Sequence, residues 1–164
     1  MEAILHPDGR LIWRGQPLRA ALGKAGVRVH KEEGDSATPV GLLPLRRVLY
    51  RADRLNPPRC AVPVEPIAQY DGWCDDPGHR DYNRPVRLPH EGRHEELWRR
   101  DGVYDIVGVL GWNDQPVVKG LGSAIFLHVA RPHHEPTEGC VALALQELTR
   151  VLAEGLTGIR VLAE

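Results

Sequence analysis

Short apolar stretches alternate with turn-forming residues along most of the chain, and this pattern predicts a mainly β protein. Val27–Lys31 alternates apolar and polar side chains, as a half-buried strand does. The apolar runs Tyr104–Leu110 and Ser123–Val129 predict two buried strands. Leu18–Lys24 is expected to form one or two helical turns. Further short strands are expected at 10–14, 45–50 and 159–162.

Near the C-terminus the hydrophobic period changes from that of a strand to that of a helix. Leu145, Leu148 and Val151 fall on one face of a helix over 144–154. Gly155 is a suitable residue for ending this helix. The fold class expected is therefore a β fold with a C-terminal helix.

The segment 53–101 is long, polar and repeatedly interrupted by proline. Little regular structure is expected in it, apart from a helical turn at 91–100. Trp73, Tyr82 and Trp98 are aromatic residues that can anchor the segment to the body of the protein. Long irregular segments in small domains are usually functional or disordered. Because the aromatic residues can anchor this segment, we expect it to be an ordered loop or lid.

Composition narrows the class of protein. The 164 residues fit a single domain, 1–164, and the 21 basic and 22 acidic residues give a net charge of -1. A general nucleic-acid binder would carry a basic excess, so this class is not expected. No run of 18 apolar residues is present, and the N-terminus shows no signal peptide. We therefore expect no stable membrane insertion, a monomer, and either another export route or a leader that has been removed.

The region from His128 to Cys140 combines residues suited to nucleophilic catalysis. A histidine ends an apolar strand, a polar loop follows, and a cysteine comes directly after Gly139. A nearby imidazole can lower the pKa of a cysteine thiol, and only the thiolate is a strong nucleophile. The amides of Gly139 and Cys140 are candidate donors to an oxyanion. From spacing alone, a core histidine and a buried structural cysteine remain an alternative.

Two motifs resemble those of the L,D-transpeptidase (YkuD) family. His128 followed by Thr137–Val141, with the sequence TEGCV, is similar to the family's catalytic signature. Lys31–Gly41, with the sequence KEEGDSATPVG, is similar to a second family segment in which one strand turns into the next. The chain is thus identified as similar to a compact, single-domain branch of this family. The resemblance implies a sandwich-like or barrel-like β fold with a C-terminal helix, into which 53–101 is inserted.

The resemblance also implies an activity. It indicates a peptidoglycan acyltransferase of the bacterial periplasm or cell envelope that needs no cofactor and reacts with carbapenems. Cys140 would form a thioester with a stem peptide at diaminopimelate and release D-Ala, with His128 as the base. An amine of a second stem would then make a cross-link, either three-to-three or from L-Ala to diaminopimelate. The alternatives are a carboxypeptidase or amidase that uses water, and a peptidoglycan-binding module without activity.

Site residues beyond the catalytic pair follow from the same resemblance. Thr137 and Gly139 are expected to shape the oxyanion pocket, and a backbone carbonyl is expected to orient His128. The family often has Gly after the histidine and Arg or Asn two positions after the cysteine, whereas this chain has Val129 and Ala142. The candidate replacements for the missing Arg are Arg131, Arg84 and Lys119.

Weaker substrate-binding candidates lie mostly in the 53–101 segment. Asp75, Asp76 and Asp81 either stabilise turns or bind the amino group of diaminopimelate. Asn113 either forms a turn or supports the loop that carries the site. The full set of weaker candidates is Arg131, Trp73, Asp75, Tyr82, Arg84 and Asn113.

No metal site is predicted. The spacings of Cys60, Cys74 and Cys140 contain no CxxC pair, and His128, His133 and His134 form no helical His-x₃-His pairing. His133 and His134 follow His128 in a loop broken by prolines, so a zinc site with Cys140 is not favoured. Both are expected to be loop residues, and Cys74 is expected to be a structural thiol.

Overall fold

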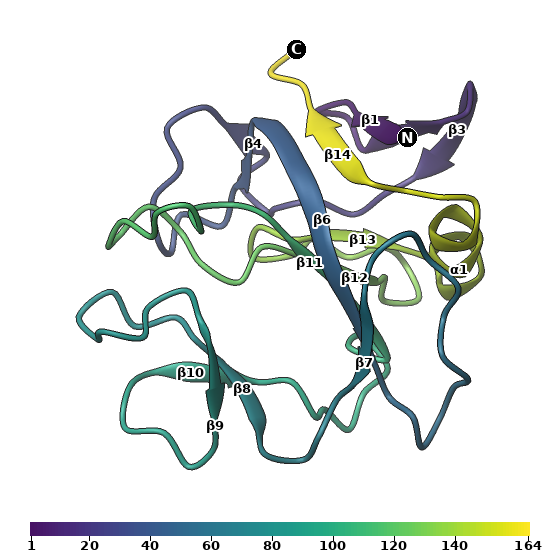
Figure 1. The fold of residues 1–164 in the computed structure, drawn as a ribbon. Helices are drawn as coiled ribbons and strands as arrows, with labels where there is room; N and C mark the ends of the chain where they lie inside the picture. Colours follow the sequence, from purple (N-terminus) through teal and green to yellow (C-terminus); the bar gives the residue numbers. More distant parts are fainter.

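The computed structural model describes residues 1–164 and contains one large sheet, one small three-stranded sheet, one two-stranded sheet and one helix (Figure 1). The large sheet has the strand order β13-β12-β11-β6-β14-β1-β2-β3, and β7 pairs with β6. Its strands are β1 (Glu2–Leu5), β2 (Arg10–Trp13), β3 (Gln16–Arg19), β6 (Gly41–Tyr50), β7 (Val64–Pro66), β11 (Ile106–Leu110), β12 (Phe126–Val129), β13 (Val141–Leu143) and β14 (Gly158–Val161).

The large sheet bends into a nearly closed barrel. Beyond β3, Ala21 exchanges two backbone hydrogen bonds of 2.9 Å with Ala142 of β13, which lies at the opposite end of the strand order. Helix α1 (Leu145–Ala153) covers the barrel and buries Leu148, Val151 and Leu152 in the same core. Complete burial of a side chain of this kind contributes roughly 1.5–3 kcal/mol. The mainly β fold and the C-terminal helix are as predicted.

The 53–101 segment contains the small sheet, which Figure 1 shows apart from the barrel. Its strands are β8 (Asp71–Cys74), β9 (Pro85–Arg87) and β10 (His94–Glu96), in the order β10-β8-β9. Trp73 attaches it to the barrel by packing edge-on against Phe126, with ring centroids 5.1 Å apart. The helical turn predicted at 91–100 is wrong, because β10 pairs with β8 there.

Local expectations also failed near the N-terminus. The helical turns predicted at Leu18–Lys24 are absent, because the end of β3 and the bridge from Ala21 occupy this segment. The strand expected at Val27–Lys31 shortens to β4 (Val27–Arg28), which pairs with β5 (Thr38–Pro39). In both places, hydrogen bonds to distant parts of the chain override local propensity.

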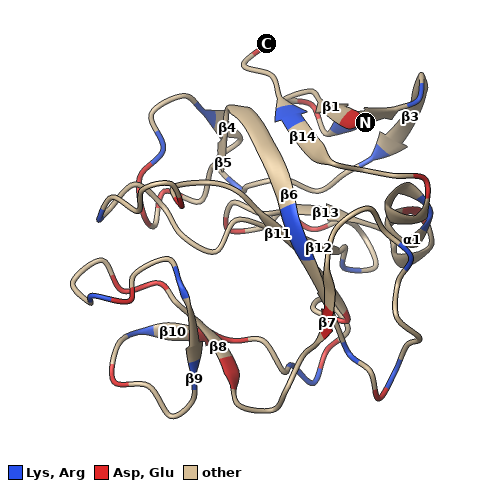
Figure 2. Cartoon of the chain, in the orientation of Figure 1, with Lys and Arg blue, Asp and Glu red and all other residues tan.

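Charged residues lie mainly outside the three strands closest to the candidate site. Figure 2 shows both signs of charge spread over the loops, whereas β11, β12 and β13 carry no Lys, Arg, Asp or Glu. The one helix is too short to cross a membrane.

Candidate active site

The Cys140 sulfur is fixed between two segments of backbone. Cys140 immediately precedes β13, which runs parallel to β12. Its Sγ donates to the carbonyl of Ala124 at 3.3 Å and accepts from the amide of Phe126 at 3.4 Å. The side chain is 9% exposed, so the sulfur has a defined position at the floor of the site.

Thr137 and Gly139 form the turn that presents Cys140. Thr137 Oγ1 donates to the Cys140 carbonyl at 2.7 Å and accepts from the Gly139 amide at 3.1 Å. Gly139 has φ +137°, and a Cβ there would lie 2.9 Å from the Ala37 carbonyl oxygen. The Gly139 amide already donates to Thr137. The Cys140 amide has no hydrogen-bond partner within the protein and is therefore free to donate to a ligand.

His128 lies in β12 and is 8% exposed. Its Nδ1 is 3.0 Å from the Val129 carbonyl oxygen. A carbonyl only accepts, so Nδ1 carries the proton and Nε2 is left as a base. Tyr104 packs edge-on against the imidazole with centroids 5.4 Å apart.

Burial holds both central groups in their neutral forms. It lowers the pKa of His128 below the usual 6.5, and the nearby Arg131 adds to this shift. Burial also raises the pKa of Cys140 to about 12, with a further contribution from Glu95. The sequence predicted a thiolate stabilised by imidazole, whereas the structure favours a thiol beside a neutral imidazole.

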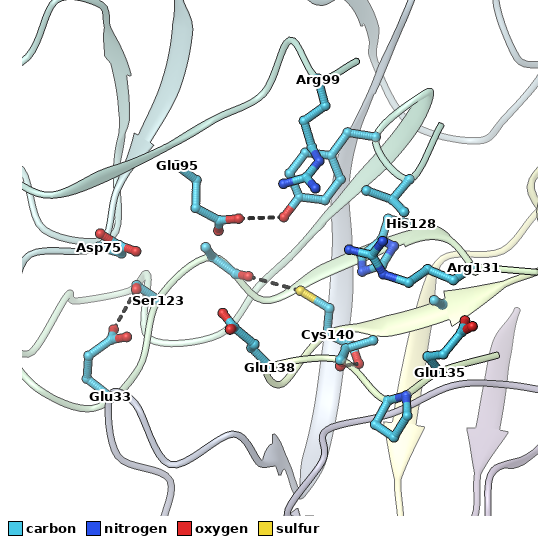
Figure 3. Close-up of a pocket in the computed structure, with 16 residues that line it drawn as sticks. Glu33, Asp75, Glu95, Arg99, Ser123, His128, Arg131, Glu135, Glu138 and Cys140 are labelled. Atoms are coloured by element: carbon cyan, nitrogen blue, oxygen red, sulfur yellow. Dashed lines mark hydrogen bonds between the residues drawn. The ribbon is translucent and has the colours of Figure 1, made fainter. Parts of the chain in front are cut away.

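Cys140 and His128 line the same cavity, whose volume is about 360 Å³. Five carboxylates and two guanidinium groups also line it: Glu33, Asp75, Glu95, Glu135, Glu138, Arg99 and Arg131. Figure 3 shows Glu33, Asp75, Glu95 and Glu138 on one side of Cys140. On the other side lie His128 and Arg131, with Glu135 near Arg131. The cavity therefore has an acidic side and a side that carries the imidazole and a cation.

The model of the L,D-transpeptidase catalytic domain (YkuD) matches residues 3–161, which is nearly the whole chain. The chain belongs to this family. Family membership indicates an enzyme of the L,D-transpeptidase type. No significant match was found among curated proteins or solved structures.

The two family motifs meet in space. In the first motif, Lys31 forms a buried ion pair with Asp35. Asp35 also accepts the amide of Ala37 at 2.9 Å, and the Ala37 carbonyl faces Gly139 of the second motif. The first motif therefore supports the turn that carries Cys140, and its Glu33 lines the cavity.

Two of the weaker candidates, Arg131 and Asp75, line the cavity; Trp73, Tyr82, Arg84 and Asn113 do not. Trp73 is buried below the site and donates from Nε1 to Asn83 Oδ1 at 3.0 Å. The Tyr82 hydroxyl donates to Glu33 at 2.7 Å and so positions a residue of the cavity wall. Asn113 closes a turn through hydrogen bonds to Val118 and Gly122.

The cations are placed differently from the family pattern. Ala142, where the family often has Arg or Asn, pairs with His128 across β12 and β13 and lines the cavity. Of the three candidate replacements, Arg131 lines the cavity, whereas Arg84 and Lys119 lie outside it. Arg99, which the sequence did not single out, is a second cation there.

The remaining polar candidates have structural contacts. Asp76 accepts amides of Gly78 and Arg93, at 2.9 and 3.2 Å, and so stabilises the loop after β8. Asp81 contacts His90 at 3.1 Å. His133 and His134 do not line the cavity.

Glu95 and Tyr104 are the principal site residues that the sequence analysis missed. The Tyr104 hydroxyl donates to Glu95 at 2.7 Å, and burial raises the pKa of both groups. Glu95 lies in the inserted segment, so no family motif indicated it. Glu95 reaches the cavity because β10 pairs with β8, and the sequence did not predict this pairing.

Proposed function

We propose that this protein is a peptidoglycan L,D-transpeptidase in which Cys140 is the nucleophile and His128 is the base. The observation that carries the proposal is the placement of both groups in one cavity, with His128 Nδ1 held by a carbonyl and Nε2 left to take a proton. Family membership supports the reaction type. The cell envelope is the location that such a substrate requires.

The reaction begins from the neutral pair. Cys140 Sγ attacks the carbonyl of the bond between diaminopimelate and D-Ala, while His128 Nε2 takes the thiol proton. The Cys140 amide donates to the developing oxyanion. His128 then returns the proton to the amine of D-Ala, the carbon–nitrogen bond breaks, and a thioester remains. The amine of a second stem attacks this thioester, releases the thiol and forms the cross-link.

The charge distribution of the cavity suits such substrates. Stem peptides carry both ammonium and carboxylate groups, and the cavity presents four carboxylates on one side of Cys140 and Arg131 on the other. We assign ammonium groups to the side of Asp75 and Glu95, and a substrate carboxylate to Arg131. Glu95, whose pKa burial raises, is also placed to accept the proton that an attacking ammonium must lose.

Incubation with purified disaccharide-tetrapeptide, followed by mass spectrometry, tests the proposal. We expect loss of D-Ala and dimers joined through diaminopimelate, and the fragmentation pattern distinguishes the three-to-three linkage from the linkage to L-Ala. Cys140→Ala is the matched control and should give neither product. Disaccharide-tripeptide without dimers would indicate water as the acceptor, and unchanged substrate would contradict the proposal.

A further inference from the structure

A cluster of metal-ligand side chains lies in the 53–101 segment, outside the cavity but next to residues that line it. Ligand atoms of Cys74, His79 and His90 all fall within 4.8 Å of one another. Cys74 ends β8 and is fully buried, while the two histidine side chains are 13% and 10% exposed. The two imidazole rings pack edge-on with centroids 4.6 Å apart.

Each imidazole in the cluster has a carboxylate neighbour. Glu91 lies 2.8 Å from His79 Nε2, and Asp81 lies 3.1 Å from His90 Nε2. Histidines that bind metals commonly have such a carboxylate, which fixes the orientation of the ring. Burial raises the pKa of the Cys74 thiol, and the backbone amide of Asp76 opposes this shift, so a metal ion would have to displace the thiol proton.

We propose that Cys74, His79 and His90 bind a zinc ion. One thiolate and two imidazoles are ligands that zinc prefers over the oxygen ligands of magnesium or calcium. Ligand atoms in a tetrahedral zinc site lie about 3.3–3.8 Å apart, so these three would have to move by about 1 Å. His79 Nδ1 and His90 Nδ1 would also have to release the amides of Asp81 and Gly92, which they accept at 3.0 and 3.1 Å.

Glycine at position 92 leaves the room that this arrangement needs. A Cβ at Gly92 would lie 3.0 Å from ring atoms of both His79 and His90. The ion would therefore connect the end of β8 to the segments on either side of β9. The small sheet has strands of only three or four residues, and a metal ion can supply stability that so small a core does not.

The zinc site adjoins one wall of the catalytic cavity. Asp75 follows Cys74, lines the cavity and pairs with Arg93 at 3.1 Å. His94 pairs with Cys74 between β10 and β8, and Glu95 of the cavity is the next residue. The ion would hold Asp75 and Glu95 in position from behind, without contact with the reacting atoms.

Cobalt(II) titration of the full-length Cys140→Ala variant tests the site, because this background removes the active-site thiol. We expect one bound cobalt ion and a near-ultraviolet band from thiolate–cobalt charge transfer. The band should disappear in Cys140→Ala/Cys74→Ser. It should persist in Cys140→Ala/Cys60→Ser, since Cys60 lies outside the cluster.

Zinc competition against a chromophoric chelator tests the histidines. His79→Gln and His90→Gln should each weaken zinc binding by at least about tenfold, the scale seen even for residues that only support a ligand. His133→Gln is the control and should leave the affinity unchanged. Circular dichroism of each variant without metal checks folding, and His90→Gln, in a loop, is expected to fold.

Two results would overturn the proposal: no thiolate–cobalt band in the Cys140→Ala background, or a band that survives Cys74→Ser. Equal zinc affinity in folded His90→Gln would also contradict it. These measurements need no turnover, so their outcome is independent of the transpeptidase assay.

Discussion

Burial gives Cys140 and His128 a neutral resting state. Both side chains are less than a tenth exposed, and the Cys140 sulfur is hydrogen-bonded to backbone groups of Ala124 and Phe126. A low dielectric environment disfavours the thiolate as well as the imidazolium. In the proposed mechanism, the proton therefore moves only when a substrate carbonyl carbon is present to accept the sulfur.

This neutral state predicts slow alkylation of the free protein. The iodoacetamide rate at Cys140 should rise with pH up to and beyond the ordinary thiol value of about 8.5, because burial raises the pKa to about 12. Rates are measured against pH by peptide mass spectrometry, with the half-buried Cys60 as internal reference. A rate at Cys140 that is already maximal below pH 7 would show a thiolate instead.

Removal of the nucleophile should abolish acylation. Cys140→Ala should lower turnover by about 10⁴-fold or more, as removal of a covalent nucleophile does in other enzymes. A carbapenem should add one covalent mass to the wild type and none to this variant. Cys60→Ala is the matched control and should keep the adduct; an adduct on Cys60 or Cys74 would contradict the assignment.

Removal of the base should slow the reaction without affecting the thiol itself. His128→Ala should lower the carbapenem acylation rate by roughly 10²–10⁴-fold. In the wild type, the acid limb of kcat/KM should lie below pH 6.5, because the active imidazole is neutral and its pKa is lowered by burial. His133→Ala should leave both the acylation rate and the acid limb of kcat/KM unchanged. A large loss of rate in His133→Ala would show that His128 is the wrong assignment for the base.

The turn before β13 fixes where the nucleophile is presented. Thr137 closes it with two hydrogen bonds, and Gly139 passes close to the Ala37 carbonyl with a positive φ. Because a Cβ at Gly139 would collide with backbone, this position requires glycine for space as well as for conformation.

Gly139→Ala should therefore destabilise the protein more than an ordinary glycine substitution. Gly120 is a matched control, since it also has positive φ, +87°, but no atom lies within 4 Å of its Cβ position. We expect Gly120→Ala to cost about 1 kcal/mol and Gly139→Ala about 2–4 kcal/mol in free energy of unfolding, with loss of acylation only in the latter. Urea denaturation of both variants measures the difference, and equal costs would contradict the proposed clash.

A shared hydrogen-bond network joins the insertion to the barrel. The Tyr82 hydroxyl donates to Glu33 of the first motif and accepts the Gly122 amide at 3.0 Å. Ser123, just before β12, also donates to Glu33. Three segments that are distant in sequence thus meet at one wall of the cavity.

Tyr82→Phe removes this junction while keeping the buried ring. It leaves the Gly122 amide unpaired, so we expect a loss of about 1–3 kcal/mol in free energy of unfolding. Tyr70→Phe is the control, because Tyr70 is 46% exposed. Urea denaturation compares the two, and an effect of Tyr82→Phe no larger than that of Tyr70→Phe would show that the junction contributes little.

Hydrophobic period and motif spacing predicted the features that depend on nearby residues. The buried strands β11 and β12, helix α1 and the placement of Cys140 and His128 in one cavity are of this kind. Each follows from side chains that lie within a few residues of one another or match a family motif.

Tertiary structure decided the features that depend on distant partners. Ala21 belongs to a sheet because Ala142 offers it two hydrogen bonds, and Glu95 reaches the cavity because β10 pairs with β8. The state of the Cys140 thiol was predicted in the wrong direction, because the pKa depends on how much water the folded chain excludes. Sequence spacing does not indicate how much water the folded chain excludes from Cys140. It also does not indicate that Cys74, His79 and His90 lie close together.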